Sequence, residues 1–274
     1  HLPNGLVRQY SLTNGPGESG CYRIGVKLEP ESTGGSKCLH ETVRTGDVLA
    51  VSVPRNNFTL SRASERTVLL AGGIGITPLL SMAQTLRQSD LVFELHVFVR
   101  DRRFLPFPEL VASFGDAAVE HVGLTPPQTA SEINRILGEH TESAQLYVCG
   151  PAPMIEAAIG VADGLGWPER SVHFEYFANP TEIDDSSAFD VALARSGLTL
   201  RVEPAQTVLQ ALRAHDIDMP SSCEQGACGT CLASVLEGEI LHQDVYLSRS
   251  ERAAGDRMLT CVSRATSDRL VLDL

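Results

Sequence analysis

The sequence predicts a multidomain protein with three successive units: a partial antiparallel β-barrel, an α/β unit with a parallel sheet, and a smaller α+β unit. Three observations support this fold class. The chain has 274 residues, which exceeds one typical domain. Its hydrophobic pattern changes near residue 67 from alternation to short apolar segments separated by helical stretches. A polar stretch then interrupts that pattern, so we expect units at residues 1–62, 63–178 and 188–274, with a linker at 179–187.

The composition is that of a globular protein, with 43% hydrophobic and 20% charged residues. Apolar runs such as residues 67–71 are far too short to cross a bilayer, which predicts no membrane association. The net charge of −12 would repel the phosphates of nucleic acids, so nucleic acid is excluded as a partner. The chain opens at His1 without a charged and then apolar leader, and we expect a cytoplasmic location.

The first unit has the alternating pattern of barrel strands. Polar and apolar residues alternate over residues 22–28 and, more weakly, over residues 48–53, which follow a turn at Gly46. We therefore expect antiparallel strands in both segments.

The second unit alternates strands with helices, which is typical of a parallel sheet. Thr77 is expected to cap the first helix, because Pro78 suits the first helical position. The predicted strands are residues 67–71, 95–99, 145–149 and 172–174, and the predicted helices are residues 78–87, 131–139 and 153–163.

The third unit begins with a β-hairpin, formed by residues 189–194 and 198–202. A helix is predicted at residues 207–215, where Val208, Leu209 and Leu212 are apolar. A loop that is rich in cysteine follows this helix.

A glycine-rich turn joins the strand at residues 67–71 to the helix after it. The turn contains Gly72, Gly73 and Gly75 and ends at Thr77. Free N–H groups at the start of a helix attract phosphate, and residues without Cβ let it approach. We expect the pyrophosphate of a dinucleotide there, and an ordinary tight turn is the alternative.

A second glycine turn follows the strand at residues 145–149. It consists of Cys149, Gly150 and Pro151. Ligands bind at the carboxyl ends of parallel strands, so both turns are expected to line one nucleotide site. The alternative for Cys149 is a small buried core residue.

The charged residues after the strand at residues 95–99 bear on the choice of nucleotide. Asp101 can accept hydrogen bonds from a ribose 2′-hydroxyl, which favours NADH. The neighbouring Arg102 and Arg103 would instead favour a 2′-phosphate, and a solvated charge run is the ordinary alternative.

Four of the seven cysteines have a spacing that is typical of plant-type 2Fe-2S ferredoxins. They are Cys223, Cys228, Cys231 and the distant Cys261. Small residues between them would let backbone N–H groups reach the sulfurs. A zinc site would favour C-x2-C pairs, and disulfides suit an odd number of cysteines poorly. The spacing therefore predicts an iron–sulfur electron carrier, with zinc and disulfides as the alternatives.

Five motifs follow one another along the chain: RQYSL at residues 8–12, GGS at 34–36, AGGIGITP at 71–78, CGP at 149–151 and CEQGACGTC at 223–231. With these motifs, the whole chain resembles the phthalate dioxygenase reductase family, and the vanillate O-demethylase reductases look nearest. The resemblance implies FMN, NADH and a 2Fe-2S cluster in one polypeptide. It also implies a barrel-type flavin domain, an NAD domain and a plant-type ferredoxin domain of the β-grasp fold.

The resemblance implies roles for residues of the first unit. Arg8 would lie near the flavin phosphate, Tyr10 against the isoalloxazine ring and Ser11 near the reactive N5. Gly35 and Ser36 would provide a second contact to the phosphate of FMN.

The resemblance also implies catalytic positions. Cys149 would lie beside the nicotinamide and the flavin, with Thr77 near the same place and Ser11 at the flavin N5. Glu175 and Phe177, at the end of the last strand of the second unit, could close over the flavin.

The implied activity is that of an NADH-dependent reductase that passes electrons through FMN to the cluster and on to a Rieske-type aromatic oxygenase or O-demethylase. NADH delivers two electrons as a hydride, the cluster accepts one, and a flavin handles both. Compared with the family's six-stranded barrel, the chain opens at about the fourth strand. The alternative is therefore a ferredoxin-type electron carrier with an inactive, N-terminally truncated flavin domain, and a zinc-stabilised binding protein is the third reading.

Overall fold

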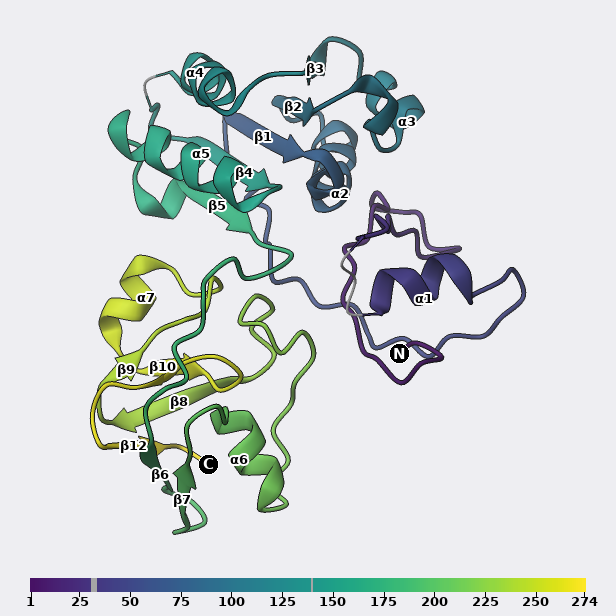
Figure 1. The fold of residues 1–274 in the computed structure, drawn as a ribbon. Helices are drawn as coiled ribbons and strands as arrows, with labels where there is room; N and C mark the ends of the chain where they lie inside the picture. The colour runs from purple at the N-terminus through teal and green to yellow at the C-terminus, as the bar shows by residue number, and fades with distance from the viewer. Residues whose placement is uncertain (31–33, 139) are drawn as a thin grey trace. The chain divides into compact units, whose positions relative to one another are not determined.

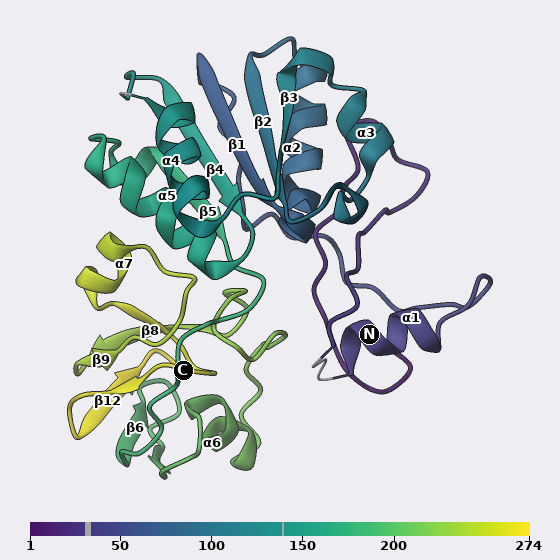
Figure 2. The same cartoon turned by 45° about the horizontal axis from the view of Figure 1, so that its top comes forward.

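The structure is a computed structural model that describes residues 1–30, 34–138 and 140–274 (Figures 1 and 2). The chain forms two compact units. One comprises His1–Leu6 and Tyr10–Tyr176, and the other comprises Val7–Gln9 and Phe177–Leu274. No helix within the described ranges has the length and apolar content needed to cross a membrane.

The first unit is built on a five-stranded sheet in which every pair of neighbouring strands is parallel. The strand order is β3-β2-β1-β4-β5. The chain places β2 on one side of β1 and β4 on the other, so the carboxyl ends of β1 and β4 lie where the strand order reverses. The strands are β1 Arg66–Gly72, β2 Phe93–Val99, β3 Ala118–Val122, β4 Ala144–Cys149 and β5 Val172–Glu175.

Helices cover both faces of this sheet (Figure 2). Helix α2 Ile76–Gln88 packs on the face that contains Leu69. Helices α4 Pro126–Leu137 and α5 Ala152–Gly164 pack on the opposite face, which contains Val68. The shorter elements are α1 Gly35–Glu41, α3 Pro108–Ala112 and the 3₁₀ helices Gly73–Gly75, Arg102–Phe104, Gly115–Ala117 and Glu169–Ser171.

The predicted parallel α/β unit is confirmed, with differences at the element boundaries. Helix α4 begins at Pro126 rather than at residue 131, because Thr125 and Gln128 form a capping box there. The predicted last residue of that helix, at position 139, lies outside the described residues. The sequence pattern does not predict β3, a short edge strand with one buried position, His121.

The prediction that Thr77 caps α2 is wrong. The 3₁₀ turn at Gly73–Gly75 runs directly into the helix, so α2 begins at Ile76 and its N-cap is Gly75. Thr77 lies in the first turn, where its hydroxyl donates to the carbonyl of Ile74 at 3.1 Å.

The predicted strands at residues 22–28 and 48–53 do not form. Among the described residues before β1, the β-structure consists of one antiparallel bridge, between Leu12 and Ile24. The physical reason is that these segments have no apolar layer to cover them, and Val48 is 95% exposed. A strand pair without a packed face is marginal in water.

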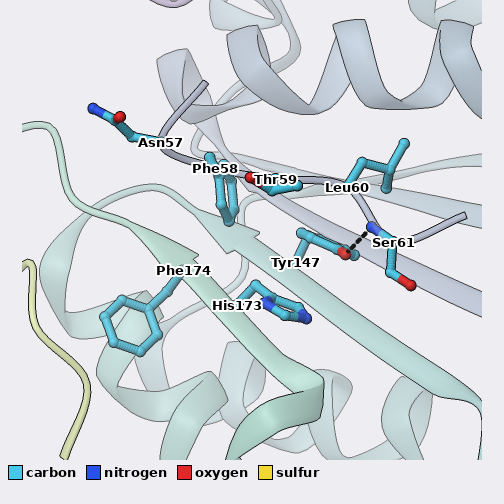
Figure 3. A pocket seen from close by; sticks show the side chains of 8 residues that line it. All are labelled: Asn57, Phe58, Thr59, Leu60, Ser61, Tyr147, His173 and Phe174. Atoms are coloured by element: carbon cyan, nitrogen blue, oxygen red, sulfur yellow. Dashed lines mark hydrogen bonds between the residues drawn. The ribbon is translucent and has the colours of Figure 1, made fainter. Parts of the chain in front are cut away.

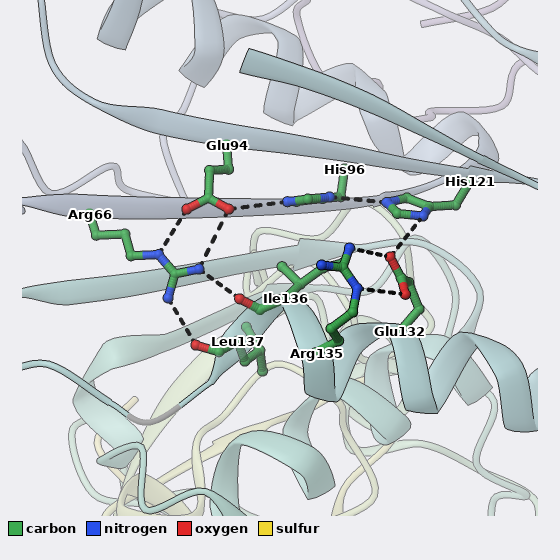
Figure 4. A network of polar contacts seen from close by, with 8 residues as sticks. All are labelled: Arg66, Glu94, His96, His121, Glu132, Arg135, Ile136 and Leu137. Carbon is green, nitrogen blue, oxygen red and sulfur yellow. Dashed lines mark hydrogen bonds and ion pairs between the residues drawn. The ribbon is translucent and has the colours of Figure 1, made fainter. Parts of the chain in front are cut away.

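A polar network ties the sheet to α4 on the face that this helix covers (Figure 4). Arg66 donates to Glu94 at 2.8 Å and to two carbonyl groups in the last turn of α4, where a helix leaves carbonyls without partners. At the other end of the network, Glu132 pairs with Arg135 at 2.6 Å. The members are Arg66, Glu94, His96, His121, Glu132 and Arg135, with the carbonyls of Ile136 and Leu137.

Two buried histidines form the middle of this network. Nδ1 of His96 lies 3.0 Å from Nε2 of His121, and the outer ring nitrogens face Glu94 and Glu132, each at 3.4 Å. The hydrogen bond from His96, together with Arg66, lowers the pKa of Glu94 to about 2 against the opposing effect of burial. Burial lowers the pKa of His121. The network therefore joins three strands to one helix through side chains that satisfy one another.

The second unit contains a five-stranded sheet with the order β10-β8-β12-β6-β7. Strand β12 is parallel to β6, and the other neighbours are antiparallel. The strands are β6 Phe189–Leu193, β7 Thr199–Val202, β8 Leu232–Glu237, β10 Arg257–Leu259 and β12 Arg269–Leu272, with a separate pair of β9 Ile240–Leu241 and β11 Arg264–Ala265.

The predicted hairpin and helix of the second unit are confirmed. Helix α6 Val208–Ala214 begins at a capping box between Thr207 and Gln210 and buries Leu209 and Leu212 in the core of the unit. Helix α7 Arg249–Ala254 begins in the same way, at Ser248.

The polar segment at residues 179–187 is bonded to the second unit. The side chain of Asn179 donates to the carbonyl of Gln243 at 2.7 Å, and the backbone N–H of Asp184 donates to Oε1 of the same Gln243 at 2.5 Å. Near the end of the segment, the buried Arg264 donates to the carbonyl of Ser187. These bonds hold the segment along the unit that follows it.

Candidate functional site

The two glycine turns of the first unit touch backbone to backbone. A Cβ on Gly75 would lie 2.3 Å from the carbonyl oxygen of Cys149, and a Cβ on Gly150 would lie 2.8 Å from Cα of Gly72. Neither position has room for a side chain. The structure therefore brings the predicted nucleotide-site residues at the ends of β1 and β4 together.

The remaining members of these turns differ in their surroundings. Gly73 has a φ of +52° and no heavy atom within 4 Å of a would-be Cβ, so its backbone is open on that side. Pro151 precedes α5 as its N-cap, and its ring would lie 2.6 Å from a Cβ on Gly72. The two turns therefore present backbone at the N-termini of helices α2 and α5, with an open side at Gly73.

Ser11, Cys149 and Glu175 meet at the carboxyl edge of the same sheet. Cys149 and Glu175 are paired residues at the ends of β4 and β5, and the hydroxyl of Ser11 donates to Oε2 of Glu175 at 3.4 Å. Burial raises the pKa of Glu175 to about 7, although the bond from Ser11 opposes the rise. Burial and the charge of Glu175 raise the pKa of Cys149, so this cysteine is a neutral thiol at neutral pH.

Glu175 is therefore a proton-holding group beside a predicted catalytic serine. Its place follows from the register of β5 on β4, which the sequence does not state. Phe177, the other residue proposed to close over a flavin, belongs to the second compact unit and is 45% exposed.

Asp101 and Thr77 have hydrogen-bond partners within the chain. Both carboxylate oxygens of Asp101 accept from Arg103, whose Nη2 lies 2.8 Å from Oδ2. These bonds lower the pKa of Asp101. A ribose hydroxyl at this position would have to share the carboxylate with Arg103. Thr77 is buried, with its hydroxyl on Ile74 and its methyl group 2.7 Å from a would-be Cβ on Gly25.

The residues predicted to hold the flavin are spread over the chain. Arg8 belongs to the second compact unit, whereas Tyr10 belongs to the first. Gly35 is buried at the start of α1, and the hydroxyl of Ser36 accepts from the backbone N–H of Glu29 at 3.2 Å.

The four predicted cluster ligands converge as two pairs of thiols. Cys223 is hydrogen-bonded to Cys228, and Cys231 is hydrogen-bonded to Cys261. In each pair one thiol lowers the pKa of the other: Cys223 lowers the pKa of Cys228 to about 5, and Cys261 lowers the pKa of Cys231. Each pair can therefore release a proton readily, as thiolate ligands must.

This arrangement fits a two-iron cluster better than a single metal ion. Among the described residues, no group of three or more His, Cys, Asp or Glu side chains is placed to hold one ion. A 2Fe-2S cluster needs four thiolates shared between two irons, and two separate pairs supply them. The backbone N–H of Gln225 donates to the sulfur of Cys223 at 3.4 Å, and the thiol of Cys228 donates to the hydroxyl oxygen of Thr230 at 3.3 Å.

Two glycines make the cysteine loop possible. Gly226 and Gly229 have φ values of +73° and +71°. A Cβ on Gly226 would lie 2.6 Å from Val262, and a Cβ on Gly229 would lie 2.4 Å from the ring of Tyr246. A side chain at either position would push the loop away from the core.

A pocket that the sequence does not predict lies on the first unit (Figure 3). Its volume is about 440 Å³. The ring of Tyr147 stacks on His173 at 4.5 Å, and its hydroxyl accepts from the backbone N–H of Ser61 at 2.7 Å. His173 is bonded to Gln145 at 2.7 Å. The lining residues are Asn57, Phe58, Thr59, Leu60, Ser61, Tyr147, His173 and Phe174.

Comparisons with known proteins support the predicted iron–sulfur domain and the predicted family. Residues 191–266 match the family model described as a 2Fe-2S iron-sulfur cluster binding domain. The chain is 43% identical to the vanillate O-demethylase oxidoreductase of Pseudomonas sp. (strain HR199 / DSM 7063), over 100% of the chain and 87% of that protein. It is 42% identical to the oxidoreductase NdmD of Pseudomonas putida over 99% of the chain, and it spans 47% of NdmD.

A solved structure is also similar to this chain. Phthalate dioxygenase reductase, described as a modular structure for electron transfer from pyridine nucleotides to [2Fe-2S], superimposes with a TM-score of 0.68 and 36% identity. The match covers 100% of this chain and 85% of that one.

Proposed function

Since the chain belongs to the phthalate dioxygenase reductase family of oxidoreductases, we propose that it transfers electrons from NADH, through FMN, to a 2Fe-2S cluster and on to a Rieske-type aromatic oxygenase or O-demethylase. The observation that carries the proposal is the convergence of four thiols in two pairs within the segment that matches a 2Fe-2S domain.

The cluster would be held by Cys223, Cys228, Cys231 and Cys261. The two pairs would supply the four thiolates that such a cluster needs, and the N–H of Gln225, which donates to the sulfur of Cys223, would stabilise negative charge on it. Bound FMN would supply the chemistry that joins a two-electron hydride donor to this one-electron carrier.

The nucleotide would be held at the two glycine turns. The glycine turn of Gly72, Gly73 and Gly75 at the start of α2, whose backbone is open at Gly73, would receive the pyrophosphate, together with Gly150 and Pro151 at the start of α5. Asp101 would accept hydrogen bonds from the ribose and so favour NADH.

The flavin would be held by Arg8 and by Gly35 with Ser36 at its phosphate, with Tyr10 against its ring. Ser11, Thr77 and Cys149 would lie beside the reacting atoms. Ser11 already bonds to Glu175, whose pKa of about 7 suits a group that holds or gives up a proton near neutral pH.

A cytoplasmic location is part of the proposal. All seven cysteines are free thiols, which is typical of a reducing compartment.

One observation favours a second candidate function, that of an electron carrier with an inactive flavin part. The described residues before β1 have a single β-bridge, and they expose Val48, Val51 and Val53 to solvent. A flavin site built on such residues would lack a packed scaffold.

An anaerobic absorption spectrum of the purified protein, before and after addition of NADH, separates the two. Flavin and iron–sulfur bands that both bleach on addition of NADH would establish the reductase. Iron–sulfur bands that do not respond to NADH would establish the carrier. A colourless protein that contains zinc would contradict both.

A further inference from the structure

We propose that Arg213 of α6 is a positioning residue for Cys223. Arg213 binds the side chains of Ser221 and Glu224, which lie on either side of Cys223 in the chain, and we call these bonds the clamp. The clamp holds a bend in the backbone. This bend directs the N–H of Gln225 at the sulfur of Cys223. The proposal rests on the proposed function in one respect, because it takes Cys223 as a cluster ligand.

The clamp is a closed ring of three hydrogen bonds. Nη2 of Arg213 donates to Oγ of Ser221 at 2.5 Å and to Oε1 of Glu224 at 2.6 Å. The hydroxyl of Ser221 in turn donates to the same oxygen of Glu224 at 3.1 Å. Cys223 lies between the two clamped residues in the chain, so the ring encloses the segment that presents its sulfur.

The backbone at Glu224 explains why this segment needs a clamp. Glu224 has a φ of +54°, a left-handed conformation that is costly for a residue with a side chain. The N–H of the next residue, Gln225, donates to the sulfur of Cys223 at 3.4 Å. The bend at Glu224 therefore aims this N–H group, and the side-chain bonds of Glu224 offset its strain.

Cys223 is also the ligand that depends most on local bonds. Cys228, Cys231 and Cys261 are buried in the unit, whereas Cys223 is only half-buried. Packing therefore fixes three of the sulfurs. The fourth is held by the loop itself, which Arg213 ties to the helix whose Leu209 and Leu212 are buried in the core.

The clamp has two separable effects on the cluster. An N–H group directed at a sulfur stabilises the additional negative charge of the reduced cluster, and a nearby cation does the same. Loss of Arg213 would remove the cation at once, and it would free Glu224 to leave the bend that aims the N–H group. Glycine at position 224 would keep the bend without a clamp, because glycine takes positive φ at no cost.

The test compares three variants: Arg213→Gln, Glu224→Gly, and the two combined. Two quantities are measured on the full chain with its cluster: the midpoint potential, from a redox titration followed by electron paramagnetic resonance, and the rate of cluster loss to the iron chelator ferrozine, from visible absorption. Arg195→Gln is the matched control, because Arg195 forms a similar ion pair in the same unit, with Asp273 at 2.7 Å.

We expect Arg213→Gln to shift the midpoint potential to more negative values. The rate of cluster loss should rise about threefold to tenfold, which is the effect expected when a half-exposed ion pair is removed and the backbone is free to leave a strained conformation. In the combined variant the loss rate should return close to that of the unchanged protein, and the potential should move back toward it, because the negative charge of Glu224 is removed together with the cation. Arg195→Gln should alter neither quantity.

Two outcomes would overturn the proposal. The first is an Arg213→Gln variant with an unchanged potential and loss rate. The second is a combined variant that loses its cluster as fast as Arg213→Gln alone, because the clamp would then not act through the backbone of residue 224. Absence of iron–sulfur bands from the unchanged protein would instead contradict the proposed function, so the two failures are distinguishable. If Arg213→Gln does not fold by circular dichroism, Arg213→Lys replaces it, with faster cluster loss and a preserved potential as the expected result and an unchanged loss rate as the contradicting one.

Discussion

The histidine network of the first unit and the four thiols of the second unit have their hydrogen bonds satisfied in opposite ways. In the first unit, His96 and His121 have carboxylate partners on both outer sides, and those carboxylates have arginine partners (Figure 4). In the second unit, the four thiols bond to one another in two pairs, and their further partners are hydroxyl groups and backbone N–H groups, among them Thr230, Thr260 and Gln225. A network in which every charged group has a partner stabilises the fold of its unit, whereas thiols that bond to one another can exchange those bonds for bonds to metal.

The largest effect should come from removing one of the four thiols of the second unit. Cys231→Ser removes a buried thiol that is hydrogen-bonded to the thiol of Cys261. We therefore expect complete loss of iron–sulfur absorption and of bound iron. Cys21→Ser is the control, because Cys21 is exposed and lies outside the loop. If the Cys231→Ser variant still binds two iron atoms, the four cysteines do not hold the metal.

The next test contrasts two glutamates of the first unit. The folded-state pKa of Glu175, about 7, lies above its ordinary value, so its contribution to stability is present below about pH 4.5 and is lost as the pH rises through 7. The loss amounts to about 3 kcal/mol. The pKa of Glu94 is lowered to about 2, so its contribution is present above pH 4.5 and is lost as the pH falls toward 2.

We therefore expect Glu175→Gln to flatten the fall in unfolding free energy between pH 5 and pH 8. Denaturant titration that follows the fluorescence of Trp167, the single tryptophan and a buried residue of the first unit, measures this. An unchanged pH dependence in the variant would mean that Glu175 is ionised in the folded protein.

A somewhat smaller effect is expected from breaking the histidine network. His96→Ala removes the ring to which His121 is bonded and leaves Glu94 with Arg66 alone, and we expect the first unit to lose about 2 kcal/mol of stability. The tryptophan fluorescence should report this loss while the iron–sulfur absorption is unchanged. Equal loss of both signals would contradict the view that this network is local to its unit.

The smallest effect is expected at the exposed pair of Asp101 and Arg103. Asp101→Asn keeps the shape but weakens acceptance from a ribose hydroxyl, so KM for NADH should rise about threefold to tenfold with little change in kcat. Steady-state reduction of ferricyanide with NADH and with NADPH measures this. A KM that does not move would place the ribose elsewhere.

The sequence alone predicts the parts of the fold that depend on local pattern. The strands near residues 67 and 145 are continuous apolar runs, and the cysteine spacing states directly which sulfurs must meet. The edge strand β3 and the unformed strands near residues 22 and 48 depend on which surfaces are covered, and alternation does not reveal that.

The same limit applies to the sites. The positions of Cys149 and Gly150 follow from a strand end and a turn, which the sequence shows. Glu175 enters the site through the register of β5 on β4, and Arg213 through the contact of a helix with a loop. Both depend on tertiary packing between segments that local sequence pattern does not connect.

The position of Cys261 has a consequence for how this protein matures. Three of the thiols lie within nine consecutive positions of the chain, but the fourth follows β10, whose Leu259 pairs with Leu232 of β8 directly after Cys231. A nascent chain can thus gather three sulfurs before its last strands exist, and it completes the set only when β10 has been synthesised and paired. Iron loading in a cell should therefore lag behind synthesis of the loop, and it would report that β10 has paired with β8.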